Sequence, residues 1–375
     1  MKIAVLRERR FNETRVSATP ETVKKLTGLK HAVAVESGAG TTAGIRDEDY
    51  VAAGATVGSA ADVLKGADIV FKVRAPDAAE LATYPKGAAM AGLLEPYAAK
   101  KEAADYAAAG ITAIAMEFVP RITRAQSMDV LSSQANLAGY RAVIEGSQLY
   151  GRALPMMMTA AGTVAAAKVF IMGAGVAGLQ AIATARRLGG IVSATDVRPA
   201  SKEQVASLGA KFIAVEDDEF KAAETAAGYA KPMSAEYQAK QAELVASHIV
   251  KQDIVITTAL IPGRAAPVLV TEAMVRSMRP GSVVVDLAVA QGGNCPLSKP
   301  DEVVDVNGVK VAGFTNLPGR IAADASALYA KNLLALLPLF TGENAAFGPK
   351  WDDEIVKAAV LTRDGQVVHP ALKDG

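Results

Sequence analysis

Residues 168–198 read KVFIMGAGVAGLQAIATARRLGGIVSATDVR, and this stretch decides the fold of the chain. A short apolar run leads into a turn with three glycines in the pattern G-x-G-x-x-G, and a helical pattern follows. A second apolar run, GIVSAT, then ends in an acidic residue. Strand, glycine-rich turn, helix, strand and acid in this order are typical of a doubly wound α/β unit with a parallel sheet.

The glycines and the acid of this stretch predict a dinucleotide site. Gly173, Gly175 and Gly178 permit a tight turn, close backbone approach to a pyrophosphate, and close packing of helix on strand. The helix N-terminus offers free N–H groups and a partial positive charge to the phosphates. Asp196 lies 18 residues beyond Gly178, where a carboxylate accepts hydrogen bonds from the adenosine ribose. Its charge favours NAD over NADP, although Arg198 could either pair with a 2′-phosphate or be a solvated surface residue.

The same alternation of apolar runs and helical patterns extends over the rest of the chain. Strands are expected in the runs IAVL at 3, AVAV at 32, IVFKV at 69, AAMAGLL at 88, ITAIAME at 111, KFIAV at 211, DIVITTA at 253, SVVVDLA at 282 and VKVAGF at 309. This rhythm indicates parallel sheets with crossover helices. Because 375 residues exceed what one core usually organises, we predict two Rossmann-like domains with parallel sheets, joined by long helices around a cleft.

Two long helical patterns, at about 128–150 and 322–340, set the expected domain limits. They predict a discontinuous N-terminal domain and an NAD-binding domain, with the limits 1–130 plus 317–375, and 131–316. The final run AAVLTRDGQVVH reads as a hairpin closed by Asp364-Gly365. Residues 217–240 interrupt the second domain with a Gly-Tyr pair and a proline, and such an insertion is more often functional or mobile than structural filler.

Composition excludes several classes of function. The chain has 40 Lys and Arg against 39 Asp and Glu, so it has no basic field for nucleic acid. One cysteine and three scattered histidines make a disulfide or a metal site improbable. The apolar start is shorter than a signal peptide requires, and no apolar run reaches the roughly 18 residues of a membrane span. We expect a cytoplasmic chain without direct membrane insertion.

Two further strand ends bear on the chemistry. The segments TTALIPGR (257–264) and DLAVAQGGN (286–294) fall where a parallel sheet meets its ligand, and their small residues would let a flat ring lie close to backbone; ordinary loops are the alternative. No histidine lies near them, whereas oxidation of an alcohol or amine needs a base for the departing proton. Hydride transfer between two nicotinamide rings needs only positioning, so the sparse site favours that reaction.

Several motifs carry a resemblance to a known family. They are RERRFNETRVSATPETVKKL, PRITRAQSMDVLSSQANLAGYRAV, MMMTAAGTV, GAGVAGLQAIATARRLG, TTALIPGRAAPVLVT and DLAVAQGGNCP. Together they resemble the NAD(H)-binding domain I of proton-translocating nicotinamide nucleotide transhydrogenases, which in bacteria is the alpha subunit or, where that subunit is split, its first piece. The similarity covers almost the whole chain, and RAQSMDVLSSQ is its most specific segment. It implies hydride transfer between NAD(H) here and NADP(H) on a partner subunit.

Alanine dehydrogenases are the related enzymes to distinguish, and they supply the alternative function. That family uses a histidine after the fourth strand and an aspartate in a D-x-A-x-D-Q-G-G segment. This chain reads AGLLEPY at 91–97, without histidine, and has Ala290 in place of the aspartate. Arg15 and Lys72, which resemble that enzyme's substrate-binding pair, remain as retained ancestry or as plain charges. A third, non-catalytic reading is an NAD-sensing module, which the polar loop at 121–129 disfavours.

The resemblance also implies roles for individual residues and partners. Arg121, Gln126 and Asp129 would form the catalytic loop that meets the nicotinamide and faces the NADP(H)-binding subunit. The implied cofactor contacts are Ser132 beside this loop, Val176 and Asp196 at the pyrophosphate and ribose, Leu260 at the ring, Gly228 and Gln241 beside the adenosine, and Tyr229 on a closing loop. A homodimer is implied, docked through partner subunits on the cytoplasmic face of the inner membrane. Whether the chain ends at Gly375 or belongs to a longer subunit stays open.

Overall fold

The computed structural model describes residues 1–98, 100–221, 233–261 and 263–373. The chain forms two compact units, Met1–Gln134 with Pro318–Gly375, and Ala135–Leu317. It leaves the first unit after Gln134 and returns after Leu317, where the sequence predicted 130 and 316. The N-terminal unit is therefore discontinuous. No helix in the described part of the chain has both the length and the apolarity to cross a membrane.

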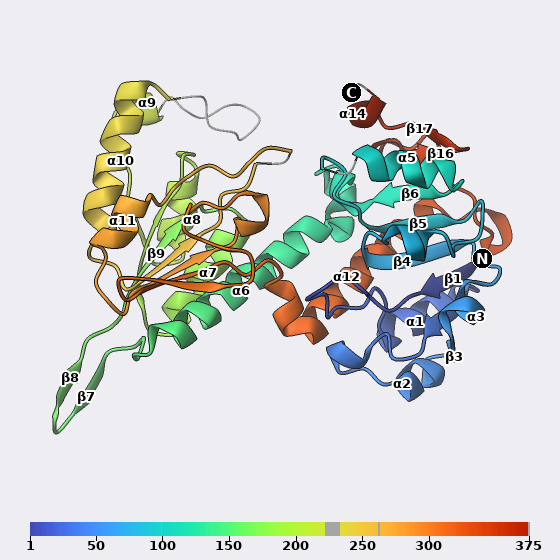
Figure 1. The fold of residues 1–375 in the computed structure, drawn as a ribbon, viewed down its shortest axis with the longest axis horizontal. Coiled ribbons are helices and arrows are strands. Elements are labelled where there is room, and N and C mark those ends of the chain that lie inside the picture. The colour runs from blue at the N-terminus through green and yellow to red at the C-terminus, as the bar shows by residue number, and fades with distance from the viewer. Residues whose placement is uncertain (99, 222–232, 262, 374–375) are drawn as a thin grey trace. The chain divides into compact units, whose positions relative to one another are not determined.

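The first unit is built on a six-stranded parallel sheet in the order β3-β2-β1-β4-β5-β6 (Figure 1). Its strands are β1 Lys2–Val5, β2 Ala32–Glu36, β3 Thr56–Gly58, β4 Ile69–Arg74, β5 Ala89–Leu93 and β6 Thr112–Ala115. Its helices are α1 Pro20–Gly28, α2 Asp47–Ala52, α3 Ala60–Leu64, α4 Ala78–Leu81, α5 Lys100–Ala108, α12 Ala322–Leu336, α13 Glu354–Ala359 and α14 Pro370–Lys373. The expected C-terminal hairpin is confirmed as β16 Thr362–Arg363 and β17 Gln366–Val367, with Asp364 and Gly365 between them.

The second unit has a seven-stranded sheet in the order β11-β10-β9-β12-β13-β15-β14. Its strands are β9 Lys168–Met172, β10 Ile191–Thr195, β11 Lys211–Phe212, β12 Ile254–Thr257, β13 Val283–Asp286, β14 Val303–Val306 and β15 Val309–Ala312. All neighbours are parallel except β14, an edge strand antiparallel to β15. The chain runs from β9 to β10 and β11 on one side and then crosses to β12 on the other. A topological switch point therefore lies between β9 and β12.

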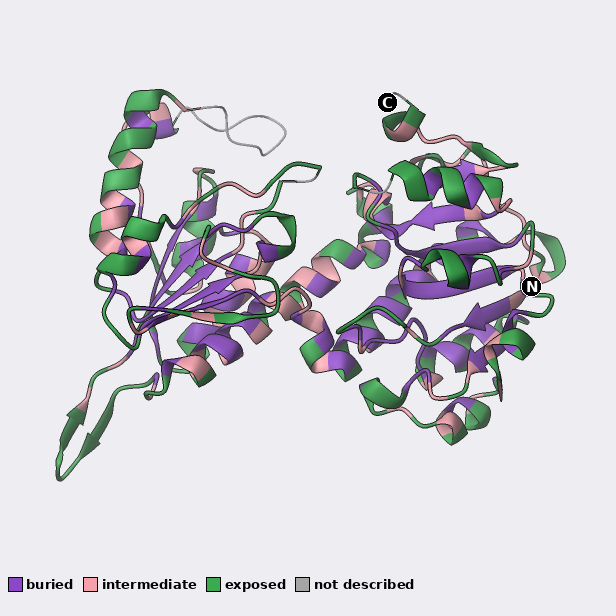
Figure 2. Ribbon diagram, in the orientation of Figure 1, coloured by how far each residue is buried: buried purple, intermediate pink, exposed green. Residues whose placement is uncertain are grey.

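Helices cover both faces of this second sheet. They are α6 Val130–Tyr150, α7 Val176–Arg187, α8 Ser201–Ser207, α9 Asp218–Lys221, α10 Ala235–Ile249 and α11 Glu272–Ser277. Residues of α6 and α7 form one core with alternate strand residues, and residues of α10 and α11 form another with the remaining strand residues. The sheet is thus buried on both sides, as its purple strands show (Figure 2). This double burial explains why continuous Val- and Ile-rich runs predicted its central strands.

One exposed hairpin departs from this layered pattern. Strands β7 Met157–Thr159 and β8 Gly162–Val164 pair antiparallel and project from the second unit (Figure 1). Both strands are coloured as exposed over most of their length in Figure 2. The sequence did not predict this hairpin, because a run without a buried face shows no periodicity that distinguishes a strand.

Candidate functional site

The glycine-rich turn joins β9 to α7 and requires glycine at two positions. Gly173 has φ +106°, and a Cβ there would lie 2.5 Å from the Thr258 hydroxyl oxygen. A Cβ on Gly178 would lie only 1.8 Å from the carbonyl oxygen of Gly173. Gly175 instead faces open space, with no heavy atom within 4 Å of the position a Cβ would take, and no side chain caps the helix there. The first N–H groups of α7 are therefore open to a ligand.

Asp196 follows β10 and is held beside this turn. Its Oδ2 accepts a hydrogen bond from the Ala174 N–H at 2.7 Å. Its Oδ1 accepts from the Arg198 backbone N–H and from Arg198 Nε, both at 2.9 Å. Burial tends to raise the pKa of Asp196, but the hydrogen bonds from Arg198 and Ala174 outweigh it, and the pKa lies below its ordinary value. The carboxylate is therefore ionised at neutral pH, and Arg198 is its partner.

The remaining predicted residues of the second unit gather at the same edge of the sheet. Gln241 on α10 accepts from the Val215 N–H at 2.9 Å and donates to Thr195 Oγ1 at 3.2 Å, so it ties α10 to the end of β10. Val176 and Leu260 are 42% and 48% exposed, which leaves two apolar side chains at the surface where strands end. Gly228 and Tyr229 lie outside the described residues.

A buried carboxylate that the sequence reasoning missed organises the loop after β13. Asp286 is fully buried and accepts four hydrogen bonds. The donors are Thr257 Oγ1 at 3.2 Å, Ala288 N at 2.9 Å, Cys295 N at 3.0 Å and Ser298 Oγ at 2.6 Å. The available signal was a charged residue closing the apolar run SVVVD, since a buried charge needs several partners.

The predicted catalytic loop lies in the first unit and contains a 3₁₀ segment, Thr123–Met128. Its Ala125 and Met128 are buried in the core of that unit. Arg124 donates to both Asp353 oxygens, at 2.9 and 2.8 Å, and to Glu354 Oε1 at 3.1 Å. The loop is thus fastened to the first turn of α13, which the returning C-terminal segment supplies.

Two of the four polar residues predicted in this region have local partners, and two do not. Asp129 accepts from the Ser132 N–H at 2.9 Å and from Ser132 Oγ at 2.6 Å, at the start of α6. The side chains of Arg121 and Gln126 are exposed and make no hydrogen bond to any residue that the structure describes. Asp129 and Ser132 therefore shape the loop, while Arg121 and Gln126 remain available to a ligand.

Arg15 and Lys72 are buried in the first unit and are paired with acids of the same chain. Lys72 Nζ lies 2.9 Å from Glu80 Oε1 and 3.4 Å from Glu8 Oε2. Arg15 forms a bidentate pair with Glu13, at 2.8 and 2.7 Å. Burial raises the pKa of Glu8 to about 6, although Lys72 opposes this shift. Both cations therefore belong to a buried ionic network.

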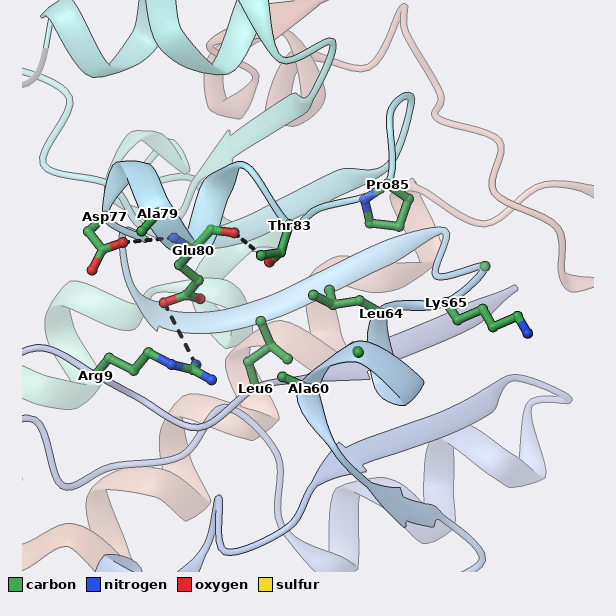
Figure 3. A pocket seen from close by; sticks show the side chains of 12 residues that line it. Leu6, Arg9, Ala60, Leu64, Lys65, Asp77, Ala79, Glu80, Thr83 and Pro85 are labelled. Atoms are coloured by element: carbon green, nitrogen blue, oxygen red, sulfur yellow. Dashed lines mark hydrogen bonds and ion pairs between the residues drawn. The ribbon is translucent and has the colours of Figure 1, made fainter.

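A hollow of about 710 Å³ adjoins this network in the first unit (Figure 3). Small and apolar side chains line much of it, among them Leu6, Ala60 and Leu64, and the Glu80 carboxylate faces Arg9 across it at 3.9 Å. No cluster of three His, Cys, Asp or Glu placed to hold a metal ion occurs among the described residues. The hollow is therefore mainly apolar, with one ion pair.

The three histidines all have packing roles outside the glycine-rich turn and the loops after β12 and β13. His31 immediately precedes β2. His248 Nε2 lies 2.8 Å from Ser193 Oγ, and its ring packs edge-on against Phe170. The ring of His369 stacks on Phe118 at 4.3 Å. None of them stands beside the proposed dinucleotide turn as a proton acceptor.

A doubly wound unit with this turn and this ionised acid, together with a second α/β unit, defines a two-domain dinucleotide-binding protein. Two family models match the chain, the N-terminal domain of alanine dehydrogenase/PNT over residues 4–138 and the C-terminal domain over residues 142–370. The chain belongs to the alanine dehydrogenase/PNT family.

Relatives within this family differ in how similar they are to the chain. The first piece of the split NAD(P) transhydrogenase subunit alpha of Rhodospirillum rubrum is 56% identical over 99% of both chains. A crystal structure of transhydrogenase from Sinorhizobium meliloti is 57% identical and superposes with a TM-score of 0.91, over 98% of this chain and all of that one. Alanine dehydrogenase of Halomonas elongata is 30% identical over the whole of this chain and 96% of its own. The transhydrogenase branch is thus much more similar than the alanine dehydrogenase branch.

Proposed function

We propose that the chain is the NAD(H)-binding component of a proton-translocating transhydrogenase, in which hydride passes between NAD(H) on this chain and NADP(H) on a partner subunit. The observation that carries this function is the open glycine-rich turn beside the ionised Asp196, in a chain that is 56% identical over its length to a transhydrogenase subunit. Hydride moves from the dihydronicotinamide ring of one cofactor to the oxidised ring of the other. No proton leaves with it, so the site needs no base.

Within this proposal the second unit binds NAD(H) along the edge of its sheet. The pyrophosphate lies on the α7 N-terminus at Gly175 and Val176, because the N–H groups there are open. Asp196 accepts the hydrogen bonds of the adenosine ribose, and Leu260 offers an apolar surface to the ring. Gln241 borders the adenosine side with Gly228, and Tyr229 closes over the bound nucleotide, so that water is excluded during transfer.

The loop of the first unit positions the ring for transfer. Arg121 and Gln126 contact the nicotinamide, since their side chains are exposed and unpaired among the described residues. Asp129, together with Ser132, fixes the start of α6 and so the end of the loop. Catalysis then consists of placing two rings at reacting distance, which alone can supply a large part of a rate enhancement.

Selectivity for NADH tests the role given to Asp196. Its lowered pKa keeps it charged at neutral pH, and Arg198 is already engaged with it, so a 2′-phosphate would meet a negative charge. We expect titration by fluorescence to give an affinity for NADH at least about 100-fold above that for NADPH, as two or three kcal/mol of repulsion would produce. Asp196→Asn should narrow this gap. Comparable affinities of the unaltered protein for both nucleotides would contradict the assignment.

The proposal includes partners that complete the reaction. One subunit binds NADP(H) and faces the 121–129 loop, and a membrane subunit carries the protons. The chain is then held at the cytoplasmic face of the inner membrane through these subunits alone. We expect it to sediment with lipid vesicles only when they contain the partner subunits; sedimentation with plain vesicles would contradict this location.

A homodimer is the proposed state of the chain, and the β7–β8 hairpin supports it. Met156, Met157 and Met158 are 61%, 43% and 77% exposed on or next to this hairpin. A two-stranded hairpin is marginal without a cover, and exposed apolar patches mark interaction sites. We expect sedimentation velocity to give the mass of a dimer, and the double variant Met156→Ser, Met158→Ser to sediment as a monomer. A monomeric unaltered chain would exclude the proposed state.

The second candidate function is NAD-dependent oxidation of an amino acid. The retention of Arg15 and Lys72 favours it, because both resemble substrate-binding residues of alanine dehydrogenases. The replacement by Ala290, the absence of a histidine at 91–97 and the lower identity of 30% weigh against it. Consumption of NADH with pyruvate and ammonia, without any partner protein, would favour this candidate over transhydrogenation.

A further inference from the structure

Asn294 joins the two loops that follow β12 and β13. Its side chain is fully buried, although the loops around it reach the surface. Oδ1 accepts from the Ala259 N–H at 3.1 Å, and Nδ2 donates to the Ala259 carbonyl at 2.9 Å and to the Pro267 carbonyl at 2.7 Å. The Asn294 carbonyl also accepts from the N–H groups of Leu269 and Val270. One residue of the β13 loop thus holds both ends of the β12 loop.

The position of Ala259 gives this clamp its significance. The amide of Asn294 pairs with both the N–H and the carbonyl of Ala259, as a neighbouring strand would. Thr258, on one side of Ala259, donates its hydroxyl to the Gly173 carbonyl at 3.1 Å. Leu260, on the other side, is 48% exposed. Asn294 therefore sets where Leu260 stands relative to the glycine-rich turn.

The strand order determines which half of a dinucleotide this loop meets. Asp196 follows β10, which lies on one side of β9, whereas the β12 and β13 loops lie on the other side. A dinucleotide with its pyrophosphate on the turn at β9 and its adenosine ribose at Asp196 must place its second half over β12 and β13. The Asn294 clamp is therefore next to the nicotinamide half.

We propose that Asn294 is a positioning residue that fixes the wall of the nicotinamide half of the site through Ala259. This proposal rests on the NAD(H) binding proposed above. The residue touches the loop and not the cofactor, so its loss lets the β12 loop move while the turn and Asp196 stay in place. Asn294 then contributes to the affinity for the whole dinucleotide but not for its adenosine part.

The test compares two ligands on the full chain, NADH and ADP. Asn294→Asp keeps the shape and the acceptor, but it places an oxygen against the carbonyls of Ala259 and Pro267, so the loop is expected to open. The dissociation constant for NADH, measured by calorimetry, should rise about 10-fold, the effect of losing roughly one net hydrogen bond. The constant for ADP should stay within about 2-fold. Asn294→Ser, which removes the donor without adding charge, is the variant to use if the aspartate variant does not fold.

Ser282→Ala is the matched structural control. Ser282 is also buried, and its hydroxyl donates to the Gln252 carbonyl at the opposite end of β13. This control should lower thermal stability and leave both dissociation constants unchanged. Equal weakening of NADH and ADP by the Asn294 variants, or unchanged NADH binding, would overturn the positioning role. Failure of the unaltered protein to bind NADH would instead overturn the proposed function.

Discussion

Gly178→Ala is expected to weaken NADH binding by more than about 100-fold and to destabilise the second unit by roughly 3 kcal/mol. The added Cβ would lie 1.8 Å from the Gly173 carbonyl oxygen and 2.8 Å from its carbon. Both atoms are backbone, so no side chain can move aside, and either α7 or the turn must shift. The same shift displaces the N–H groups assigned to the pyrophosphate. Thermal unfolding and NADH fluorescence measure the two effects, with a fall in melting temperature of roughly 6–12 °C.

Gly175→Ala separates binding from stability. No heavy atom lies within 4 Å of the position its Cβ would take, and φ is −76°, which any residue adopts. The melting temperature should therefore stay unchanged, while NADH binds more weakly because the methyl group stands where the pyrophosphate approaches. Normal NADH binding by Gly178→Ala would show that this turn is not the phosphate site.

Gln126→Asn is expected to slow hydride transfer by about 10- to 100-fold while the dissociation constant for NADH changes by less than about 2-fold. The substitution keeps the amide and shortens the side chain by one methylene. Gln126 has no partner among the described residues, so its removal costs little stability. Its loop is fastened by Arg124 to Asp353, so the shorter side chain cannot be compensated by movement of the loop. Single-turnover transfer to NADP⁺ on the partner subunit measures the rate.

Gln366→Asn, at an exposed position of β17 in the same unit, is the control for this prediction. It should transfer hydride at the rate of the unaltered chain. An unchanged rate in Gln126→Asn as well would remove Gln126 from the mechanism and leave Arg121 as the candidate contact of the loop.

Burial decided which strands could be predicted from the sequence. The central strands β9, β12 and β13 have almost no exposed residue, so their runs of Val and Ile were distinct. Strand β3 has three residues, none of them buried, and β14 alternates between exposed and partly buried residues at an edge. Both were missed, because a short or half-exposed strand resembles a loop in composition.

The candidate site was predictable where a residue type is required by local backbone geometry. Gly173 and Gly178 follow from the turn, and the spacing to Asp196 follows from the length of one helix and one strand. The pairing of Arg198 with Asp196 and the clamp formed by Asn294 did not follow, because a sequence does not show which carbonyl or carboxylate a side chain meets. The polar loop at 121–129 was interpreted as one functional cluster, yet Arg124 pairs with a residue 229 positions away.

The central claim is direct hydride transfer to a nucleotide on another protein. The measurement uses NADH deuterated at the transferring position of the nicotinamide, the purified chain, and NADP⁺ bound to the NADP(H)-binding subunit of a related transhydrogenase. Mass spectrometry then follows the label in the NADPH formed. We expect the deuterium to appear in NADPH without exchange with water, and only when both proteins are present. No labelled NADPH, together with NADH consumed by pyruvate and ammonia on this chain alone, would contradict the account.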